Sequence, residues 1–282
     1  MNKLVFQSDF GLLDGAISAM RGISYSVNPD LSISDLTHAI PAFNVWEASY
    51  RLFQTISYWP ENTVFVSVVD PGVGSVRRSI VAKLKDNKYV VTPDNGTLTH
   101  LFITKQILEV RVINEDINRL KGSEDSYTFH GRDVYAFTGA RLASEVIDYV
   151  GVGELVDNSS IVLLNIKEPI VSGETITGTI DILDKRFGSL WTNINANIFD
   201  ENNIVFGDKL FVKIINEGRI LYNNIITYGK SFSDVNIGET LIFNNSINYI
   251  SVAINQGDFS RAYNIDTGIS WVIEFRRYRD ER

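Results

Sequence analysis

The heptapeptide TVFVSVV, residues 63–69, is an almost uninterrupted apolar run that ends at Asp70. Runs of this length form strands that are covered on both faces, as in parallel sheets flanked by helices. In open sheets of this kind, ligands bind beyond the carboxyl ends of the strands. The run therefore predicts a buried strand of an α/β sheet, with Asp70 at the edge where ligands bind.

The sequence on both sides of this strand alternates between strand and helix patterns. Leu4–Phe6 is a short apolar run, and Ser79–Lys83 and Lys88–Thr92 are strand candidates on either side of a polar turn at Asp86–Asn87. Apolar residues recur at helical spacing in three segments, marked by Ile17, Met20, Ile23 and Val27, by Trp46, Tyr50, Phe53 and Ile56, and by Val134, Phe137, Leu142 and Val146. This alternation predicts an N-terminal α/β sandwich with a mostly parallel sheet over residues 1–168.

The rest of the chain has a different pattern. Strand-like runs are separated by turns rich in asparagine and glycine, and they cover Thr175–Leu183, Lys209–Ile215, Ile220–Tyr228, Thr240–Phe243, Tyr249–Ile254 and Ser270–Phe275. Several short strands with turn signals between them are typical of antiparallel barrels and sandwiches. We therefore predict a small C-terminal antiparallel β-barrel domain over residues 169–282, with a boundary near Lys167–Ser172.

The composition argues against several classes of protein. The chain has 282 residues, is 44% hydrophobic and carries a formal net charge of −8. Such an acidic chain does not suit a nucleic-acid backbone, which is bound by clustered Lys and Arg. Cysteine is absent, the amino terminus lacks the apolar segment of a secretory signal, and no apolar run approaches the roughly 18 residues of a membrane helix. We expect a cytoplasmic protein without a nucleic-acid or membrane partner.

Polar side chains gather where first-domain strands end. The three clusters are Ser8–Gly11 with Asp14, Asp70–Arg77, and Thr128–Asp133, and Pro93–Gly96 adds a turn signal. Each cluster also has a structural interpretation, because Asp9 and Asp14 suit turns and helix caps, the glycines suit a tight turn, and a lone histidine is often a buried hydrogen-bonding group. The residues alone leave both interpretations open.

Two other motif matches are ruled out because the residues that should accompany them are missing. Asp9–Phe10–Gly11 looks like the metal-binding triplet of protein kinases, but no Gly-rich loop or paired lysine precedes it. Gly72–Val73–Gly74 lacks the third glycine and the later acidic residue of a dinucleotide-binding loop. We therefore expect neither a kinase nor a nicotinamide-dependent enzyme.

Together the clusters resemble the S-adenosylmethionine hydroxide adenosyltransferase family, which is related to enzymes that use fluoride or chloride. The resemblance spans nearly the whole chain and rests on Ser8–Gly11, Val69–Gly74, Pro93–Gly96 and Thr128–Asp133, in that order. It implies hydrolysis of S-adenosylmethionine, in which water attacks the ribose C5′ carbon and gives adenosine and methionine. It also implies a homotrimer with sites at subunit interfaces, with no cofactor and no metal.

The resemblance places a catalytic set on Asp70, Arg77 and His130. It implies that Asp70 accepts a hydrogen bond from water, while Arg77 and His130 stabilise charge on the oxygen. In the halide-using relatives the position of Asp70 is aromatic and that of Val73 carries a hydroxyl. Halide transfer is therefore the alternative, and hydrolysis is the main expectation.

The resemblance also implies substrate-binding residues in both domains. In the first domain these are Asp9, Asp14, Phe43, Phe129 and Gly131, with Asp14 at the ribose hydroxyls; in the second they are Asp184, Phe187, Ser189, Ser246, Ile254 and Gln256. Asp184 would hold the methionine ammonium and Ser246 the carboxylate. Two positions depart from the pattern: Ser189 replaces a frequent asparagine, and Ile247 replaces an arginine of the halide branch.

Two further alternatives stay open at this point. One is a metal-dependent hydrolase, because carboxylates with a histidine can bind divalent cations; its ligands would be Asp9, Asp70, Asp94, His130 and Asp133. The other is a binding protein for S-adenosylmethionine or a nucleoside that does not turn it over.

Overall fold

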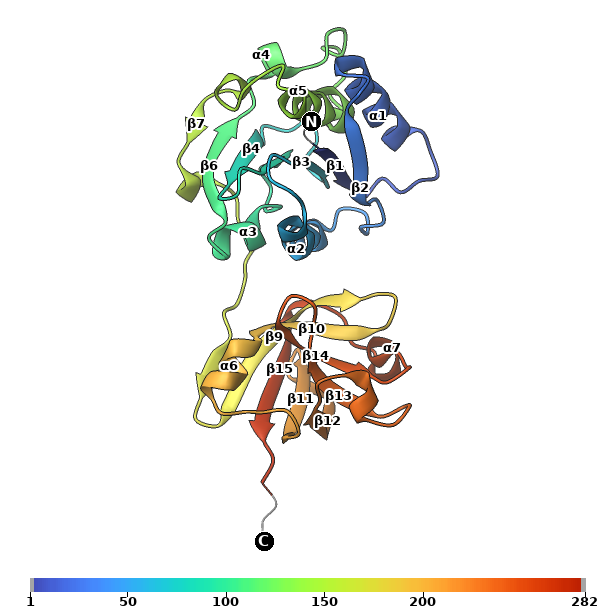
Figure 1. Cartoon of the computed structure of the whole chain (residues 1–282), viewed down its shortest axis with the longest axis vertical. Coiled ribbons are helices and arrows are strands. Elements are labelled where there is room, and N and C mark those ends of the chain that lie inside the picture. Colours follow the sequence, from blue (N-terminus) through green and yellow to red (C-terminus); the bar gives the residue numbers. More distant parts are fainter. Residues whose placement is uncertain (1–2, 280–282) are drawn as a thin grey trace. The chain divides into compact units, whose positions relative to one another are not determined.

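The computed structural model describes residues 3–279, and the chain divides into two compact units, residues 1–164 and 165–282 (Figure 1). The division falls four residues before the predicted boundary after residue 168. In the part of the chain that the structure describes, no helix is both long and apolar enough to cross a membrane.

The first unit is built on a seven-stranded sheet with the order β2-β1-β3-β5-β4-β6-β7. Its strands are β1 (Lys3–Ser8), β2 (Ser32–Thr37), β3 (Val64–Val68), β4 (Ser79–Leu84), β5 (Tyr89–Pro93), β6 (Ile107–Val112) and β7 (Leu155–Val156). Strands β2, β1, β3 and β5 pair in parallel, and β4 runs antiparallel to both β5 and β6. Only β4 and β7 oppose the common direction, which confirms the mostly parallel sheet.

Helices cover both faces of this sheet, with α1 and α5 on one face and α2 and α3 on the other (Figure 1). The helical segments are α1 (Ala16–Val27), α2 (Val45–Thr55), η1 (Ile56–Tyr58), α3 (Thr99–Ile103), α4 (Glu115–Asn118), η2 (Gly131–Ala136), α5 (Phe137–Ala143), η3 (Val150–Val152) and η4 (Asn158–Ser160). Because side chains alternate along a strand, Val64, Val66 and Val68 pack against the first face while Phe65 packs against the second. This is why residues 63–69 are apolar at nearly every position.

The predicted helix after His130 is partly wrong. The segment begins as a π-helix, η2, continues as α5 and ends at Ala143, so Val146 lies outside it and is exposed. Glu145 adopts a positive φ of 59°, a left-handed conformation that ends the helix before Val146.

The second unit is a barrel in which seven strands close through the pairing of β9 with β10, while β8 pairs outside the ring. The elements are β8 (Ile170–Ser172), β9 (Thr175–Asp184), β10 (Ser189–Asn195), α6 (Ala196–Glu201), β11 (Lys209–Asn216), β12 (Arg219–Tyr228), η5 (Phe232–Asp234), β13 (Thr240–Asn244), β14 (Tyr249–Ile254), α7 (Phe259–Tyr263) and β15 (Gly268–Arg277). Its interior is a single apolar cluster that includes Leu190, Phe199, Val212, Val252 and Phe275.

The barrel is confirmed, but it is not wholly antiparallel. Strands β12 and β13 pair in parallel through Thr227–Leu241 and Tyr228–Ile242. The connection between them is no hairpin, because it passes through η5, where Ser231 and Asp234 form a capping box. This longer crossing returns the chain to the same end of the barrel before β13 begins.

Gly139 offers a test of how closely α5 packs on the sheet. A Cβ atom there would lie 2.4 Å from Val66 Cγ2 and 3.3 Å from Leu4 Cδ1. We expect G139A to lower the free energy of unfolding by about 1–3 kcal/mol because the core is overpacked, as measured by urea denaturation. The control is G22A on α1, where a Cβ meets nothing within 4 Å; it should stabilise by about 0.5–1 kcal/mol. Equal effects of the two substitutions would contradict this packing.

Candidate functional site

An ion pair closes the loop after β3. Arg77 Nε lies 2.9 Å from both carboxylate oxygens of Asp70, and Arg77 Nη2 lies 2.5 Å from Asp70 Oδ2. The two side chains are only 11% and 5% exposed. Burial by itself lowers the pKa of Arg77, but the hydrogen bond to Asp70 and nearby negative charge raise it overall. The guanidinium is therefore held as a cation beside Asp70.

The loop between these residues is a succession of tight turns. Asp70 Oδ1 accepts a hydrogen bond from Gly72 N at 3.2 Å, and Ser75 N donates to Gly72 O at 3.0 Å. Gly74 has a φ of +78°, and a Cβ there would lie 3.2 Å from Tyr127 O. The turn interpretation of the glycines is therefore correct, and the turns also bring the loop against the segment that precedes His130.

His130 precedes the π-helix η2 and is buried. Burial lowers the pKa of its ring; Glu115 and Asp70 raise it, while Arg77 and Arg119 lower it further. The next residue, Gly131, is tightly packed, since a Cβ would lie 3.1 Å from the Phe10 ring and 3.3 Å from the Phe129 ring, so these rings would have to shift. Single π-turns of this kind often occur at functional sites.

A cavity of about 290 Å³ brings most of the first-unit candidates together. Its lining residues are Asp9, Phe10, Ala42, Phe43, Val68, Asp70, Val73, Thr128, Phe129, His130 and Gly131. Asp9 Oδ2 accepts a hydrogen bond from Phe43 N at 2.8 Å, and Phe43 has a φ of 67°. A positive φ is uncommon for a bulky residue, so Asp9 holds Phe43 in a strained conformation at the cavity.

Two expected residues lie outside this lining. Arg77 contacts Asp70 but does not itself line the cavity. Asp14 is exposed, and its Oδ1 accepts a hydrogen bond from Ala16 N at 2.9 Å at the start of α1. The structural interpretation of Asp14 therefore holds, and its role at ribose hydroxyls stays a prediction.

The proposed ligands of the metal alternative are not assembled. Asp94 pairs with Arg78 at 2.5 Å, and Asp133 pairs with Arg132 at 2.7 Å. Neither carboxylate lines the cavity with Asp9 and Asp70. Among residues 3–279, no group of three or more His, Cys, Asp or Glu side chains is placed to hold a metal ion.

The second unit has a larger cavity, of about 1080 Å³. All six residues expected there line it, namely Asp184, Phe187, Ser189, Ser246, Ile254 and Gln256. Trp191 and the cations Arg186, Lys230 and Arg261 line it too, and Ile247 does not. None of these three cations was among the residues expected from the sequence.

Two turns present the lining residues of this cavity. At the β9–β10 turn, Gly188 N donates to Asp184 O at 2.7 Å, and Gly188 has a φ of +68°. At the β13–β14 turn, the buried Asn245 accepts hydrogen bonds from the amides of Ile247 and Tyr249, both at 3.0 Å. Asn245 therefore fixes the turn that carries Ser246, a role that the sequence analysis missed.

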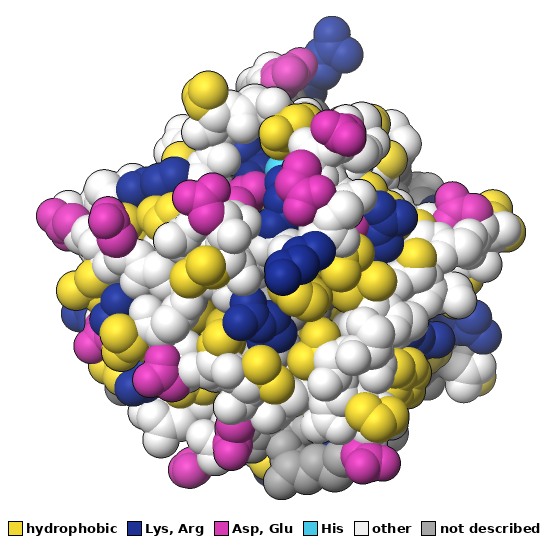
Figure 2. Space-filling model, turned by 90° about the horizontal axis from the view of Figure 1, so that it is seen from above, with side chains coloured by type: hydrophobic (Ala, Val, Ile, Leu, Met, Phe, Trp, Pro, Cys, Tyr) yellow, Lys and Arg dark blue, Asp and Glu magenta, His cyan; other side chains and the backbone are white. Residues whose placement is uncertain are grey.

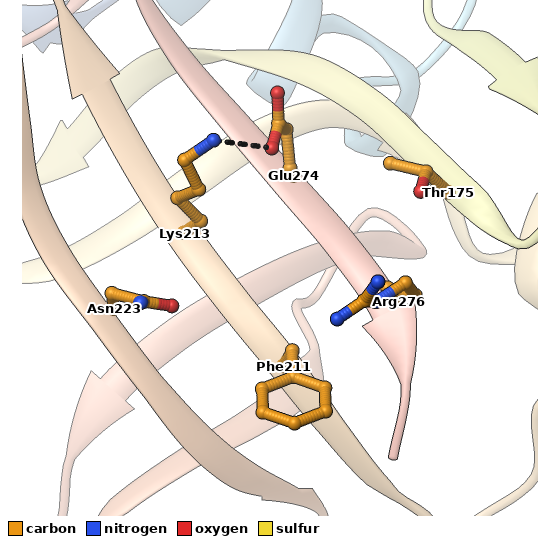
Figure 3. A pocket seen from close by; sticks show the side chains of 6 residues that line it. All are labelled: Thr175, Phe211, Lys213, Asn223, Glu274 and Arg276. Carbon is orange, nitrogen blue, oxygen red and sulfur yellow. Dashed lines mark hydrogen bonds and ion pairs between the residues drawn. The ribbon is translucent and has the colours of Figure 1, made fainter. Parts of the chain in front are cut away.

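A third hollow, of about 390 Å³, lies on the second unit and contains no expected residue (Figure 3). Lys213 Nζ lies 3.2 Å from Glu274 Oε2, and the Arg276 guanidinium lies 5.1 Å from the Phe211 ring centre. Its lysine is already paired and its arginine lies over an aromatic ring, so we assign this hollow no ligand.

The fold and the cavities define a two-unit protein, in which an α/β unit with a buried Asp–Arg pair and a histidine is joined to a β-barrel unit with a larger cavity. Family models match both units: the SAM hydroxide adenosyltransferase N-terminal domain matches residues 4–151, and the corresponding C-terminal domain matches residues 178–272. The chain therefore belongs to the SAM hydroxide adenosyltransferase family, which confirms the resemblance seen in the sequence.

Individual relatives agree with this assignment. The (R)-S-adenosyl-L-methionine hydrolase of Methanocaldococcus jannaschii is 33% identical over 94% of this chain and 93% of its own length. A fluorinase from an Actinoplanes species is 25% identical over 96% of each chain. An uncharacterised conserved protein from Thermotoga maritima has a crystal structure that matches with a TM-score of 0.87 and 32% identity, over 97% of this chain and 100% of its own.

The Asp70–Arg77 pair can be tested by a double-mutant cycle. We expect R77M to lower the free energy of unfolding by about 3–5 kcal/mol, because it leaves a buried carboxylate without its cation. The double variant D70N/R77M should lose less than the sum of the single losses. The control is R279M, whose ion pair with Glu174 is 70% and 56% exposed and should contribute about 0–1 kcal/mol. Additive effects at positions 70 and 77, measured by denaturant titration, would contradict a coupled pair.

Proposed function

We propose that this protein is an S-adenosyl-L-methionine hydrolase that forms adenosine and L-methionine. The observation that carries the proposal is the buried Asp70–Arg77 pair, because Asp70 lines one cavity together with His130, Phe43 and Phe129. Support also comes from relatives named (R)-S-adenosyl-L-methionine hydrolase in M. jannaschii and Salinispora tropica, which are 33% and 32% identical.

The chemistry explains why so few catalytic groups are needed. Attack at C5′ expels a neutral thioether from a sulfonium, so the leaving group needs no proton. The protein has to aim a water molecule in line with the C5′–S bond and assist loss of its proton. Positioning of this kind can contribute several kcal/mol, and a positioned base typically adds about 10²–10⁴-fold.

In this proposal each catalytic group acts on the attacking water. Asp70 accepts one of its hydrogen bonds, and Arg77 fixes the direction of that carboxylate through its contacts with both carboxylate oxygens. His130 lines the same cavity and stabilises the charge that develops on the oxygen. The apolar rings of Phe43 and Phe129 pack against the nucleoside and exclude other water.

The methionine part of the substrate is assigned to the second-unit cavity. Asp184 holds the ammonium and Ser246 the carboxylate, as the family resemblance implies. Ile247 supplies no cation, so a cationic residue of the lining joins Ser246 in binding the carboxylate. The candidates are Arg186, Lys230 and Arg261. The proposed binding residues are divided between two units, and this division supports a homotrimer whose sites combine units of neighbouring subunits.

The remaining expectations are part of the same proposal. The reaction as written needs no cofactor, and the protein acts in the cytoplasm without a nucleic-acid or membrane partner. On the face drawn in Figure 2, Lys and Arg side chains are interspersed with Asp and Glu, so this face offers no continuous basic surface for a nucleic-acid backbone. Residues 1–168 serve as the catalytic domain and residues 169–282 as the barrel domain.

The test is incubation of purified protein with S-adenosylmethionine in ¹⁸O-labelled water, with and without chelator and halide. We expect adenosine with ¹⁸O on its 5′ oxygen, in equal yield with chelator. A 5′-halo nucleoside would assign the protein to the halide alternative, and binding without turnover would make it a binding protein. Loss of activity with chelator and its return with added metal would favour the metal-dependent alternative.

The catalytic roles predict how variants fail. We expect H130N and R77A to lower kcat by about 10²–10⁴-fold while KM changes much less, because these groups act mainly in the transition state. The control is R279A, which removes an exposed arginine and should leave both constants unchanged. Equal losses in affinity and turnover for H130N would contradict its role in the chemical step.

A further inference from the structure

His38 holds the loop that follows β1 at two points. Its ring Nδ1 lies 2.7 Å from Ser8 Oγ, which also accepts a hydrogen bond from Phe10 N at 3.3 Å. Its carbonyl oxygen accepts a hydrogen bond from Gly11 N at 2.9 Å. Asp9 lies between these two attachments, so a single histidine fixes the backbone on either side of it.

The ring of His38 is enclosed by the protein. His38 is 5% exposed and Ser8 is 0% exposed. The other ring nitrogen, Nε2, lies 3.2 Å from Asp35 Oδ1, and Asp35 pairs with Arg21 of α1. Burial lowers the pKa of the ring; Asp35 raises it and Arg21 lowers it, and the overall effect is a lower pKa. The ring is therefore neutral near pH 7, and a hydrogen bond between uncharged groups joins it to Ser8.

Ser8, His38 and Asp35 have the residue types of a nucleophilic triad. The hydroxyl of Ser8 is nevertheless buried, and Ser8 does not line the cavity that contains Asp9 and Phe10. A nucleophile has to reach the reacting atom of its substrate. The cluster therefore acts through the loop that it holds and not on a substrate directly.

The loop sets the position of two aromatic rings at the first-unit cavity. Asp9 Oδ2 accepts the hydrogen bond from Phe43 N, at 2.8 Å, that holds Phe43 at its positive φ. The ring of Phe10 packs edge-on against that of Phe129, with the ring centres 5.8 Å apart. Phe43 and Phe129 are the rings that the proposed function places against the nucleoside. A shift of the loop would therefore move both.

We propose that His38 is a positioning residue for the nucleoside part of the substrate, acting through the hydrogen bond between its ring and Ser8. This inference rests on the proposed function, which assigns the nucleoside to this cavity. Groups that bind a ligand need to be held to within about 0.5 Å by side chains whose own positions are fixed. Loss of the bond between His38 and Ser8 should therefore weaken the binding of adenosine. Methionine, which is assigned to the second unit, should bind as before.

The test compares two substitutions that keep different parts of the imidazole. An asparagine amide lies close to the place of Nδ1 and a glutamine amide close to that of Nε2, so H38N can still bond to Ser8 and H38Q cannot. We expect H38Q to raise the Kd of adenosine by about 10-fold and H38N to raise it much less, as measured by titration calorimetry of the full-length protein. The Kd of methionine should be unchanged in both variants. An adenosine Kd that is unchanged in H38Q, or raised equally in H38N, would overturn the inference.

A second buried histidine of the same unit provides the matched control. His100 Nδ1 lies 2.8 Å from Ser49 Oγ, and both residues are buried. Neither lines the first-unit cavity. H100Q removes the same kind of contact and should leave the Kd of adenosine unchanged. An equal rise in H100Q and H38Q, or a matching loss of methionine binding in H38Q, would indicate a general loss of structure and contradict a positioning role.

A further variant keeps the test valid if H38Q does not fold. S8A removes the hydroxyl to which the His38 ring is bonded, so it should raise the Kd of adenosine by a factor similar to that expected for H38Q. The double variant H38N/S8A should bind adenosine like S8A, because both substitutions act on one hydrogen bond. Adenosine binding of wild-type strength in S8A would also overturn the inference.

Turnover separates this inference from the proposed function. We expect H38Q to raise KM for S-adenosylmethionine by about 10-fold while kcat changes much less, because the groups at the attacking water are unchanged. If the wild type binds adenosine but forms none from S-adenosylmethionine, the hydrolysis is wrong, and the adenosine affinities still decide the role of His38. If the wild type forms adenosine and H38Q has the same KM and adenosine Kd, only the role of His38 is wrong.

Discussion

The ion pair between Asp70 and Arg77 fixes the loop on which the proposed chemistry depends. Asp70 follows the most buried strand of the sheet, and Arg77 lies just before β4, so the pair ties the end of one strand to the start of another. Both side chains are withdrawn from water, and a buried charge without its partner is strongly destabilising. The pair therefore fixes the direction of the Asp70 carboxylate at the base of the loop. The same arginine reaches Ser79, and through it Glu115 and His130.

The two units divide the proposed work between them. The first unit supplies the polar groups that act on water, at the edge of a sheet whose strands are buried on both faces. The second unit supplies a wider cavity with an acid, aromatic rings and cations, which suits an amino-acid group with both charges. Family models match each unit separately, so both halves of the proposed site come from the same family.

Local patterns explain what the sequence could predict of the fold. Strand β3 and helix α1 were predictable because burial on two faces demands a continuous apolar run, and burial on one face demands a helical period. Strand β2, SISDLT, was missed because it lies at the sheet edge and none of its residues is buried. The parallel pairing of β12 with β13 was missed because it depends on the path of a connection and not on the pattern of either strand.

The site was predictable only where several residues form one motif. Asp70, Phe129 and His130 were found through four short motifs in order, and they line one cavity. Glu115 belongs to no such motif, and its contacts are with Ser79 and His130, which are distant in sequence. Asn114, which caps α4 by accepting from Asp116 N, marks a helix start but says nothing of what the helix faces. Contacts of this kind arise from tertiary packing and leave no local signal.

Stereochemistry at the reacting carbon tests the account most directly. S-adenosylmethionine made with a single deuterium of known configuration at C5′ would be converted to adenosine, and the configuration of the product determined by NMR after derivatisation. A single in-line attack by water held at Asp70 predicts inversion at C5′. Retention would require two successive displacements through a covalent intermediate on the protein, and would contradict the account.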